Sequence, residues 1–153
     1  MHLIGFIEED LVNYKTPSML LMMPKCDWKC GRSLCHNHSL AKGSGVAVAA
    51  PYLVKRYLLN DITKSVVFSG LEPFDSFEDV IEFINLFRQQ SPDMIVIYTG
   101  YDEEEISSEI ESLQEYPNII VKFGRYILGD YPHFDDILGV NLASDNQYAE
   151  KIS

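Results

Sequence analysis

The chain has 153 residues, of which 46% are hydrophobic and 23% are charged, a composition typical of a globular protein with one core. Its formal net charge of −11 repels the phosphate backbone of DNA and RNA, which argues against a nucleic-acid-binding protein. The first residues lack the basic leader of a signal peptide, and no apolar run is long enough to cross a membrane. We therefore expect a cytoplasmic protein without a membrane partner.

Apolar runs alternate with amphipathic segments along the chain, which predicts strands alternating with helices. Residues 3–7 predict an edge strand, followed by a turn at the acidic residues 8–10. Further strands are predicted at residues 19–23, 64–68, 94–98, 118–122 and 138–143. Helices are predicted at residues 51–60, 76–87 and 102–113, with Ser76 and Asp102 as N-caps. An alternative for the first helix begins it at residue 47 and makes Pro51 a kink.

This alternation predicts right-handed crossovers between parallel strands, and therefore an α/β fold with mostly parallel strands. Functional sites in such sheets lie at the carboxyl ends of the strands. The rule places three segments on one rim: residues 24–38, 69–73 and 99–101.

The three cysteines of the chain, Cys26, Cys30 and Cys35, all lie on the loop 24–38. An odd number argues against a disulfide scaffold, and their concentration on one loop favours ligation of a soft metal over unrelated thiols. Three thiolates would leave one iron of a four-iron cluster open to another ligand. Zinc is the alternative, because His36 or His38 would supply a fourth ligand.

The loop resembles the C-x3-C-x2-C cluster loop of the radical S-adenosylmethionine (SAM) enzymes, which often ends in Cys-His-Asn. Cys26, Cys30 and Cys35-His36-Asn37 match in order, with four residues rather than two in the second gap. The resemblance implies a [4Fe-4S] cluster held by the three cysteines, with SAM chelating the open iron. It also implies reductive cleavage of SAM to a 5′-deoxyadenosyl radical.

Later segments extend the resemblance. Ser69-Gly70-Leu71-Glu72-Pro73 is similar to the Gly-Gly-Glu-Pro motif of these enzymes, which implies that Glu72 and the backbone of Ser69, Gly70 and Leu71 hold the SAM amino group. Tyr98-Thr99-Gly100-Tyr101 resembles a segment of the anaerobic ribonucleotide reductase activases, and we include Thr99 among the cofactor-binding residues. Ser144-Asp145-Asn146-Gln147 is similar to the Ser-x-Asn-Gln near their end. Alternatively, each of these segments is an ordinary turn, and in that case the Glu72 side chain is exposed to solvent.

Together these resemblances imply a single radical SAM domain over residues 1–153, folded as a partial, open (β/α) barrel. The implied function is an activating enzyme, an oxidoreductase that generates a glycyl radical on anaerobic ribonucleotide reductase. Flavodoxin or ferredoxin would donate the electron. Two alternatives stay open: a small-molecule radical SAM enzyme similar to the deazaguanine synthases, and a non-catalytic binding subunit stabilised by zinc or a cluster.

Overall fold

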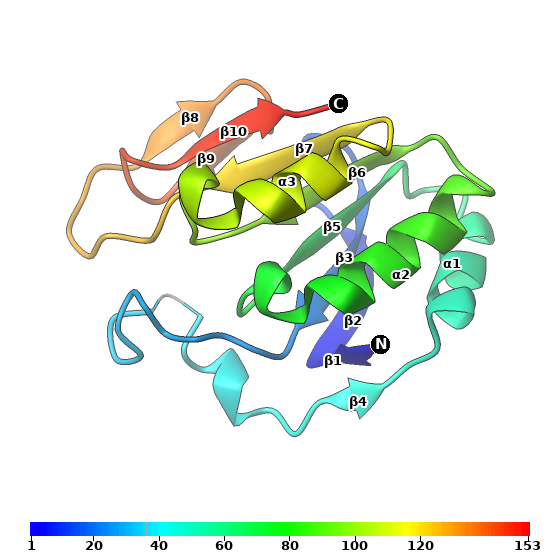
Figure 1. Cartoon of the computed structure of the whole chain (residues 1–153), viewed down its shortest axis with the longest axis horizontal. Helices are drawn as coiled ribbons and strands as arrows, with labels where there is room; N and C mark the ends of the chain where they lie inside the picture. The colour runs from blue at the N-terminus through cyan, green and yellow to red at the C-terminus, as the bar shows by residue number, and fades with distance from the viewer. Residues whose placement is uncertain (36) are drawn as a thin grey trace.

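The computed structural model of the chain describes residues 1–35 and 37–153, and a six-stranded sheet forms its centre (Figure 1). The order across the sheet is β10–β7–β6–β5–β3–β2. These strands are β2 (Gly5–Asp10), β3 (Ser18–Met23), β5 (Ser65–Gly70), β6 (Met94–Tyr98), β7 (Ile119–Phe123) and β10 (Tyr148–Lys151).

Strands β3, β5, β6 and β7 run parallel, as predicted, whereas the edge strands β2 and β10 are antiparallel to their neighbours. Among the described residues the two edges do not pair with each other, so these strands form an open sheet and no closed barrel. The prediction of a mixed α/β fold with a mostly parallel sheet is confirmed.

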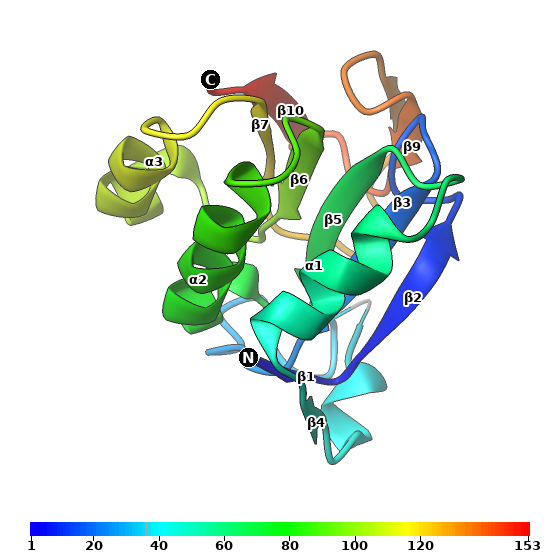
Figure 2. The ribbon, with the colours of Figure 1, turned by 90° about the vertical axis from the view of Figure 1, so that its right-hand side faces the viewer.

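The helices α1 (Ala50–Leu58), α2 (Phe77–Arg88) and α3 (Ser107–Leu113) cover one face of the sheet (Figure 2). Their apolar side chains pack against every second residue of the parallel strands, including the fully buried Phe68, Ile97 and Val121. In the part of the chain that the structure describes, the connections also contain short 3-10 helices: η1 (Leu40–Lys42), η2 (Pro73–Ser76) and η3 (Glu103–Ile106). None of the helices in the described part of the chain is long and apolar enough to cross a membrane.

The C-terminal part of the chain covers the other face of the sheet. Strands β8 (His133–Asp135) and β9 (Val140–Leu142) form an antiparallel hairpin, and Leu138 and Leu142 pack against the alternate strand residues Val67 and Val96. A second small pair, β1 (His2–Leu3) and β4 (Val46–Ala47), lies near the N-terminus. Both faces of the parallel strands are therefore buried, which explains their continuous apolar sequences.

Several local predictions were wrong. Residues 8–10 continue β2 rather than turning. Ser76 occupies the predicted N-cap position of α2, but its side chain makes no cap bond and its buried hydroxyl has no partner among the described residues, because η2 runs directly into α2. By contrast, Pro51 lies in the first turn of α1 and residues 46–47 are extended, which excludes the kink. The strand predicted at 138–143 belongs to the small hairpin, and the sequence analysis missed β10.

Candidate functional site

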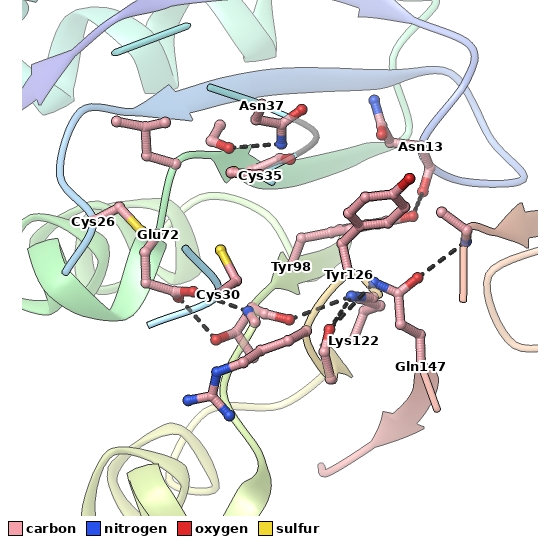
Figure 3. Close-up of a pocket in the computed structure, with 18 of the residues that line it drawn as sticks. Asn13, Cys26, Cys30, Cys35, Asn37, Glu72, Tyr98, Lys122, Tyr126 and Gln147 are labelled. Carbon is pink, nitrogen blue, oxygen red and sulfur yellow. Dashed lines mark hydrogen bonds between the residues drawn. The ribbon is translucent and has the colours of Figure 1, made fainter. Parts of the chain in front are cut away.

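The carboxyl ends of the four parallel strands surround a cavity of about 450 Å³ (Figure 3). The cavity is lined by the cysteine loop after β3, the turn after β5, the segment after β6 and the residues after β7. All eight residues predicted from the sequence as ligands or cofactor-binding residues line it: Cys26, Cys30, Cys35, Ser69, Gly70, Leu71, Glu72 and Thr99. The cavity therefore lies where the sequence analysis expected a site, at the carboxyl ends of the parallel strands.

The cysteine loop is shaped by two residues with left-handed backbone conformation, Trp28 (φ 63°) and Gly31 (φ 81°). The N–H of Gly31 donates to the carbonyl of Trp28 at 2.8 Å, and the N–H of Cys35 donates to the carbonyl of Gly31 at 3.1 Å. The wide second cysteine gap thus forms a hydrogen-bonded turn, and Cys35 lines the cavity together with Cys30.

The three thiols are half-buried and free. Burial raises the pKa of Cys26 to about 11, and it also raises the pKa of Cys30, whose neighbour Cys35 adds to the effect. The N–H of Trp28 donates to the Cys26 sulfur at 3.3 Å and opposes the rise. Cys26 and Cys30 are therefore protonated in the metal-free chain at neutral pH, and a metal must displace their protons when it binds. Three cysteines that line one cavity, one of them with a backbone donor to its sulfur, fit the ligation of an iron–sulfur cluster.

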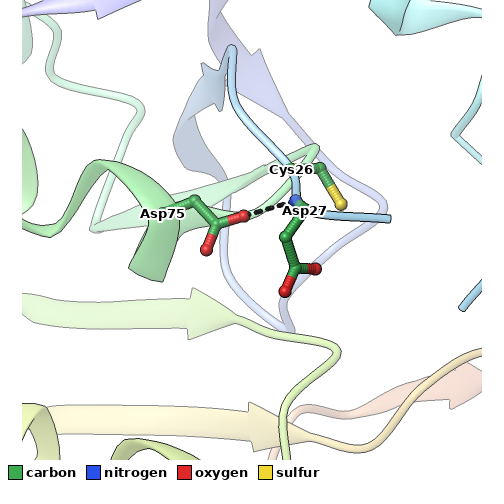
Figure 4. A group of neighbouring side chains, drawn as sticks. All are labelled: Cys26, Asp27 and Asp75. Atoms are coloured by element: carbon green, nitrogen blue, oxygen red, sulfur yellow. Dashed lines mark hydrogen bonds between the residues drawn. The ribbon is translucent and has the colours of Figure 1, made fainter. Parts of the chain in front are cut away.

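Hydrogen bonds of the described loop residues attach the loop to the end of β5 and to η2. The N–H of Glu72 donates to the carbonyl of Lys25 at 2.7 Å, and the Asn37 amide donates to the carbonyl of Gly70 at 2.9 Å. The N–H of Asp27 donates to the Asp75 carboxylate at 2.7 Å (Figure 4).

The ligand atoms of Cys26, Asp27 and Asp75 lie within 4.8 Å of one another (Figure 4). Asp75 is already engaged, because it accepts from the N–H of Asp27 and, at 2.8 Å, from the hydroxyl of Tyr101. We therefore interpret this group as an anchor of the loop and not as a separate metal centre.

Gly70 ends β5 with a φ of 98°, which L side chains rarely adopt. A Cβ at this position would lie 2.7 Å from the backbone nitrogen of Met23 and 2.9 Å from its oxygen. The N–H of Leu71 donates to that same oxygen at 3.1 Å. Glycine therefore allows β5 to approach the start of the cysteine loop closely, and it brings the Ser69–Glu72 turn to the cavity.

Glu72 is 5% exposed, so the alternative of a solvated carboxylate is wrong. It accepts hydrogen bonds from the Thr99 hydroxyl at 2.8 Å, the N–H of Gly100 at 2.9 Å and the N–H of Phe74 at 3.2 Å. Burial raises the pKa of Glu72 to about 7, although these donors oppose the rise. A buried carboxyl group with a perturbed pKa in a cavity is a candidate for contact with a ligand.

Lys122 is a cavity residue that the sequence analysis missed. Its ammonium donates to the carbonyl of Gly124 at 2.8 Å and approaches that of Thr99 at 3.4 Å, and its side chain is buried. Burial lowers its pKa to about 7, whereas the negative charge of Glu72 acts in the opposite direction. The sequence feature that could have identified Lys122 is that it is the single charged residue in the otherwise apolar run 119–123.

Of the two histidines proposed as a fourth zinc ligand, the structure describes only His38. His36 lies outside the described residues. His38 is exposed, its Nδ1 lies 3.2 Å from the carbonyl oxygen of Cys35, and it does not line the cavity.

A family model described as a 4Fe-4S single cluster domain matches residues 17–133. The match includes the cysteine loop, Glu72, Thr99 and Lys122. No curated protein and no solved structure matches the chain.

Proposed function

The chain belongs to the family of 4Fe-4S single cluster domains, and from this premise we propose that it is a radical SAM activating enzyme. The observation that carries the proposal is that the cysteines and Glu72 line one cavity. Cys26, Cys30 and Cys35 would hold a [4Fe-4S] cluster, and three thiolates leave one iron for a further ligand. The chemistry supplied by the bound cluster and SAM is one-electron reductive cleavage to methionine and a 5′-deoxyadenosyl radical.

Two buried groups of opposite charge type support an amino acid ligand in this cavity. The Glu72 carboxylate would accept from an N–H of the amino group of the SAM methionine moiety, and Lys122 would donate to its carboxylate. The backbone of Ser69, Gly70 and Leu71 forms the adjacent wall. Each group alone is costly to bury, and a ligand with both an amino group and a carboxylate would satisfy both.

The size of the cavity favours a protein substrate over a second small molecule. Leu138 and Leu142 fill the inner face of the sheet, and the remaining cavity of about 450 Å³ is near the lower end of the range for sites of one small ligand, roughly 300–1,000 Å³. SAM would occupy much of it, so the substrate would present a flexible segment at the mouth. The resemblance to the activases makes anaerobic ribonucleotide reductase our proposed partner, with flavodoxin or ferredoxin as the electron donor.

Anaerobic reconstitution with iron and sulfide tests the proposal. We expect four irons per chain, an electron paramagnetic resonance (EPR) signal of the reduced cluster that changes on addition of SAM, and formation of 5′-deoxyadenosine. A glycyl-radical signal should follow when the reductase is added. Cys35→Ala should keep the fold and abolish SAM cleavage, whereas Ser33→Ala on the same loop should retain it.

Other outcomes would support the alternatives. One zinc per chain with no response to SAM would indicate a binding subunit without catalysis. SAM cleavage that serves a small molecule and produces no radical on the reductase would indicate an enzyme similar to the deazaguanine synthases.

A further inference from the structure

Arg125 places a fixed positive charge at the cavity. It follows Gly124 after β7, and its side chain is 25% exposed. Its Nη2 donates to both carboxylate oxygens of Glu105, at 2.8 and 2.7 Å, and its Nη1 lies 3.6 Å from Asp102. The guanidinium carbon is 5.6 Å from the centre of the Tyr101 ring. Because Glu105, Asp102 and the Tyr101 ring all contact the guanidinium, its position and its charge are restrained.

Glu105 is shared with a second cation on the cysteine loop. Lys29 lies between Cys26 and Cys30, and its ammonium is 3.6 Å from Glu105 and 4.6 Å from the centre of the Tyr101 ring. Lys29 and Arg125 both line the cavity together with Cys30, whereas Glu105 contacts both cations but does not line it. The carboxylate therefore partly offsets two cations that share the cavity with the cysteines.

Arg125 shares the cavity with Cys26 and Cys30, two of the proposed cluster ligands. A positive charge at a partly buried site favours any negative charge that is added nearby. Reduction adds one electron to an iron–sulfur cluster, and nearby charge is one of the determinants of its reduction potential.

We propose that Arg125 and Glu105 form a charge pair that sets the reduction potential of the cluster, with Arg125 raising the potential and Glu105 lowering it. The proposal rests on the cluster of the proposed function but not on SAM cleavage. A purely structural role, in which the pair only holds the loop in place, would make loss of either partner act in the same direction. An electrostatic role makes the two losses act in opposite directions.

The test is an anaerobic redox titration of the reconstituted cluster, followed by EPR, in the wild type and in Arg125→Gln, Glu105→Gln and the double variant. We expect Arg125→Gln to shift the reduction equilibrium about tenfold toward the oxidised cluster, which is about 59 mV for one electron. Glu105→Gln should raise the potential, and the double variant should lie near the wild type because both charges are gone. Arg125→Lys, which keeps the charge, should also stay near the wild type.

The exposed ion pair Arg56–Glu8, between α1 and β2, provides the matched control, and Arg56→Gln and Glu8→Gln should leave the potential unchanged. If Arg125→Gln assembles no cluster, the test depends on Glu105→Gln alone. A reduction potential of Glu105→Gln that does not rise above that of the wild type then overturns the inference. Shifts of the same sign in the two single variants also overturn it. A wild-type chain without a cluster would overturn the proposed function as well, whereas an intact cluster insensitive to both changes overturns this inference alone.

Discussion

The carboxylate of Glu72 accepts a hydrogen bond from the backbone N–H of Gly100 at 2.9 Å, although the two residues follow different strands. Its other oxygen accepts from the Thr99 hydroxyl at 2.8 Å. One buried side chain therefore joins the turn after β5 to the segment after β6. The same carboxylate lines the cavity, so it both supports the rim and contributes to the site.

Glu72 should give the metal-free chain a pH-dependent stability. Its folded pKa of about 7 lies above the usual 4.5, so the folded state binds the proton more tightly. The resulting stabilisation is complete below pH 4.5 and is lost as the pH rises through 7. We expect this group to lower the free energy of unfolding by about 3 kcal/mol between pH 5 and pH 8.

Urea denaturation across this range measures the effect. Glu72→Gln should remove this part of the pH dependence, whereas Glu78→Gln, at an exposed position on α2, should keep the wild-type profile. An unchanged profile in Glu72→Gln would show that another group is responsible.

Lys122 should make the free energy of unfolding depend on pH in the opposite direction to Glu72, and in a higher pH range. Its folded pKa of about 7 lies below the usual 10.5, so the folded state binds the proton less tightly and stability rises from pH 7 to pH 10.5. Lys122→Met, which keeps an unbranched side chain, should lose this rise and weaken SAM binding at least tenfold. Lys64→Met, at an exposed lysine just before β5, should affect neither. Full SAM affinity in Lys122→Met, measured by equilibrium dialysis, would contradict a role for this lysine in the site.

Gly70→Ala should destabilise the rim. The new Cβ would meet the Met23 backbone at 2.7 Å in addition to the strain of the φ of 98°, and we expect a loss of about 3 kcal/mol in the free energy of unfolding. Gly100→Ala is the matched control on the same rim, because its Cβ would lie 3.6 Å from its nearest neighbours and its φ is not positive. Equal stability of the two variants in denaturation experiments would show that β5 does not need this close approach.

The sequence predicted the elements whose apolar pattern is strong. The runs at 19–23 and 94–98 became β3 and β6, and the strand-end rule brought the cysteine loop and Glu72 to one cavity. Asp102 was predicted as a cap, and its N–H donates to the Glu105 carboxylate at 3.0 Å.

The failures occur where tertiary contacts decide the local structure. β10 is short and mostly exposed, so its pairing with β7 leaves no periodic signal. Ser76 is the N-cap residue of α2 but makes no cap bond, because the chain is already helical in η2, whose own cap is Glu72 with its side chain accepting from the N–H of Phe74. Glu72 could be predicted as a site residue only from its motif, because its burial depends on Thr99 and Gly100 in a distant segment.

Gln147 should be a structural anchor of the cavity wall. Its side-chain oxygen accepts from the N–H groups of Ala143 and Ser144, at 3.0 and 3.2 Å, and its amide donates to the carbonyl of Gly124 at 3.2 Å. Gln147→Ala would leave three backbone groups without this partner, and we expect a loss of about 3 kcal/mol in the free energy of unfolding. Gln90→Ala, at an exposed glutamine, should cost less than about 0.5 kcal/mol.

The carbonyl of Gly124 also accepts from Lys122, so loss of Gln147 removes one of two donors to the same oxygen. The remaining donor, Lys122, belongs to the proposed SAM site, whereas Gln147 does not. Experiments on the two variants can therefore separate the two roles. At a temperature where Gln147→Ala is still folded, its iron content should equal that of the wild type and its SAM affinity should fall less than that of Lys122→Met. A variant of normal stability that nevertheless fails to bind SAM would assign Gln147 to the ligand site instead.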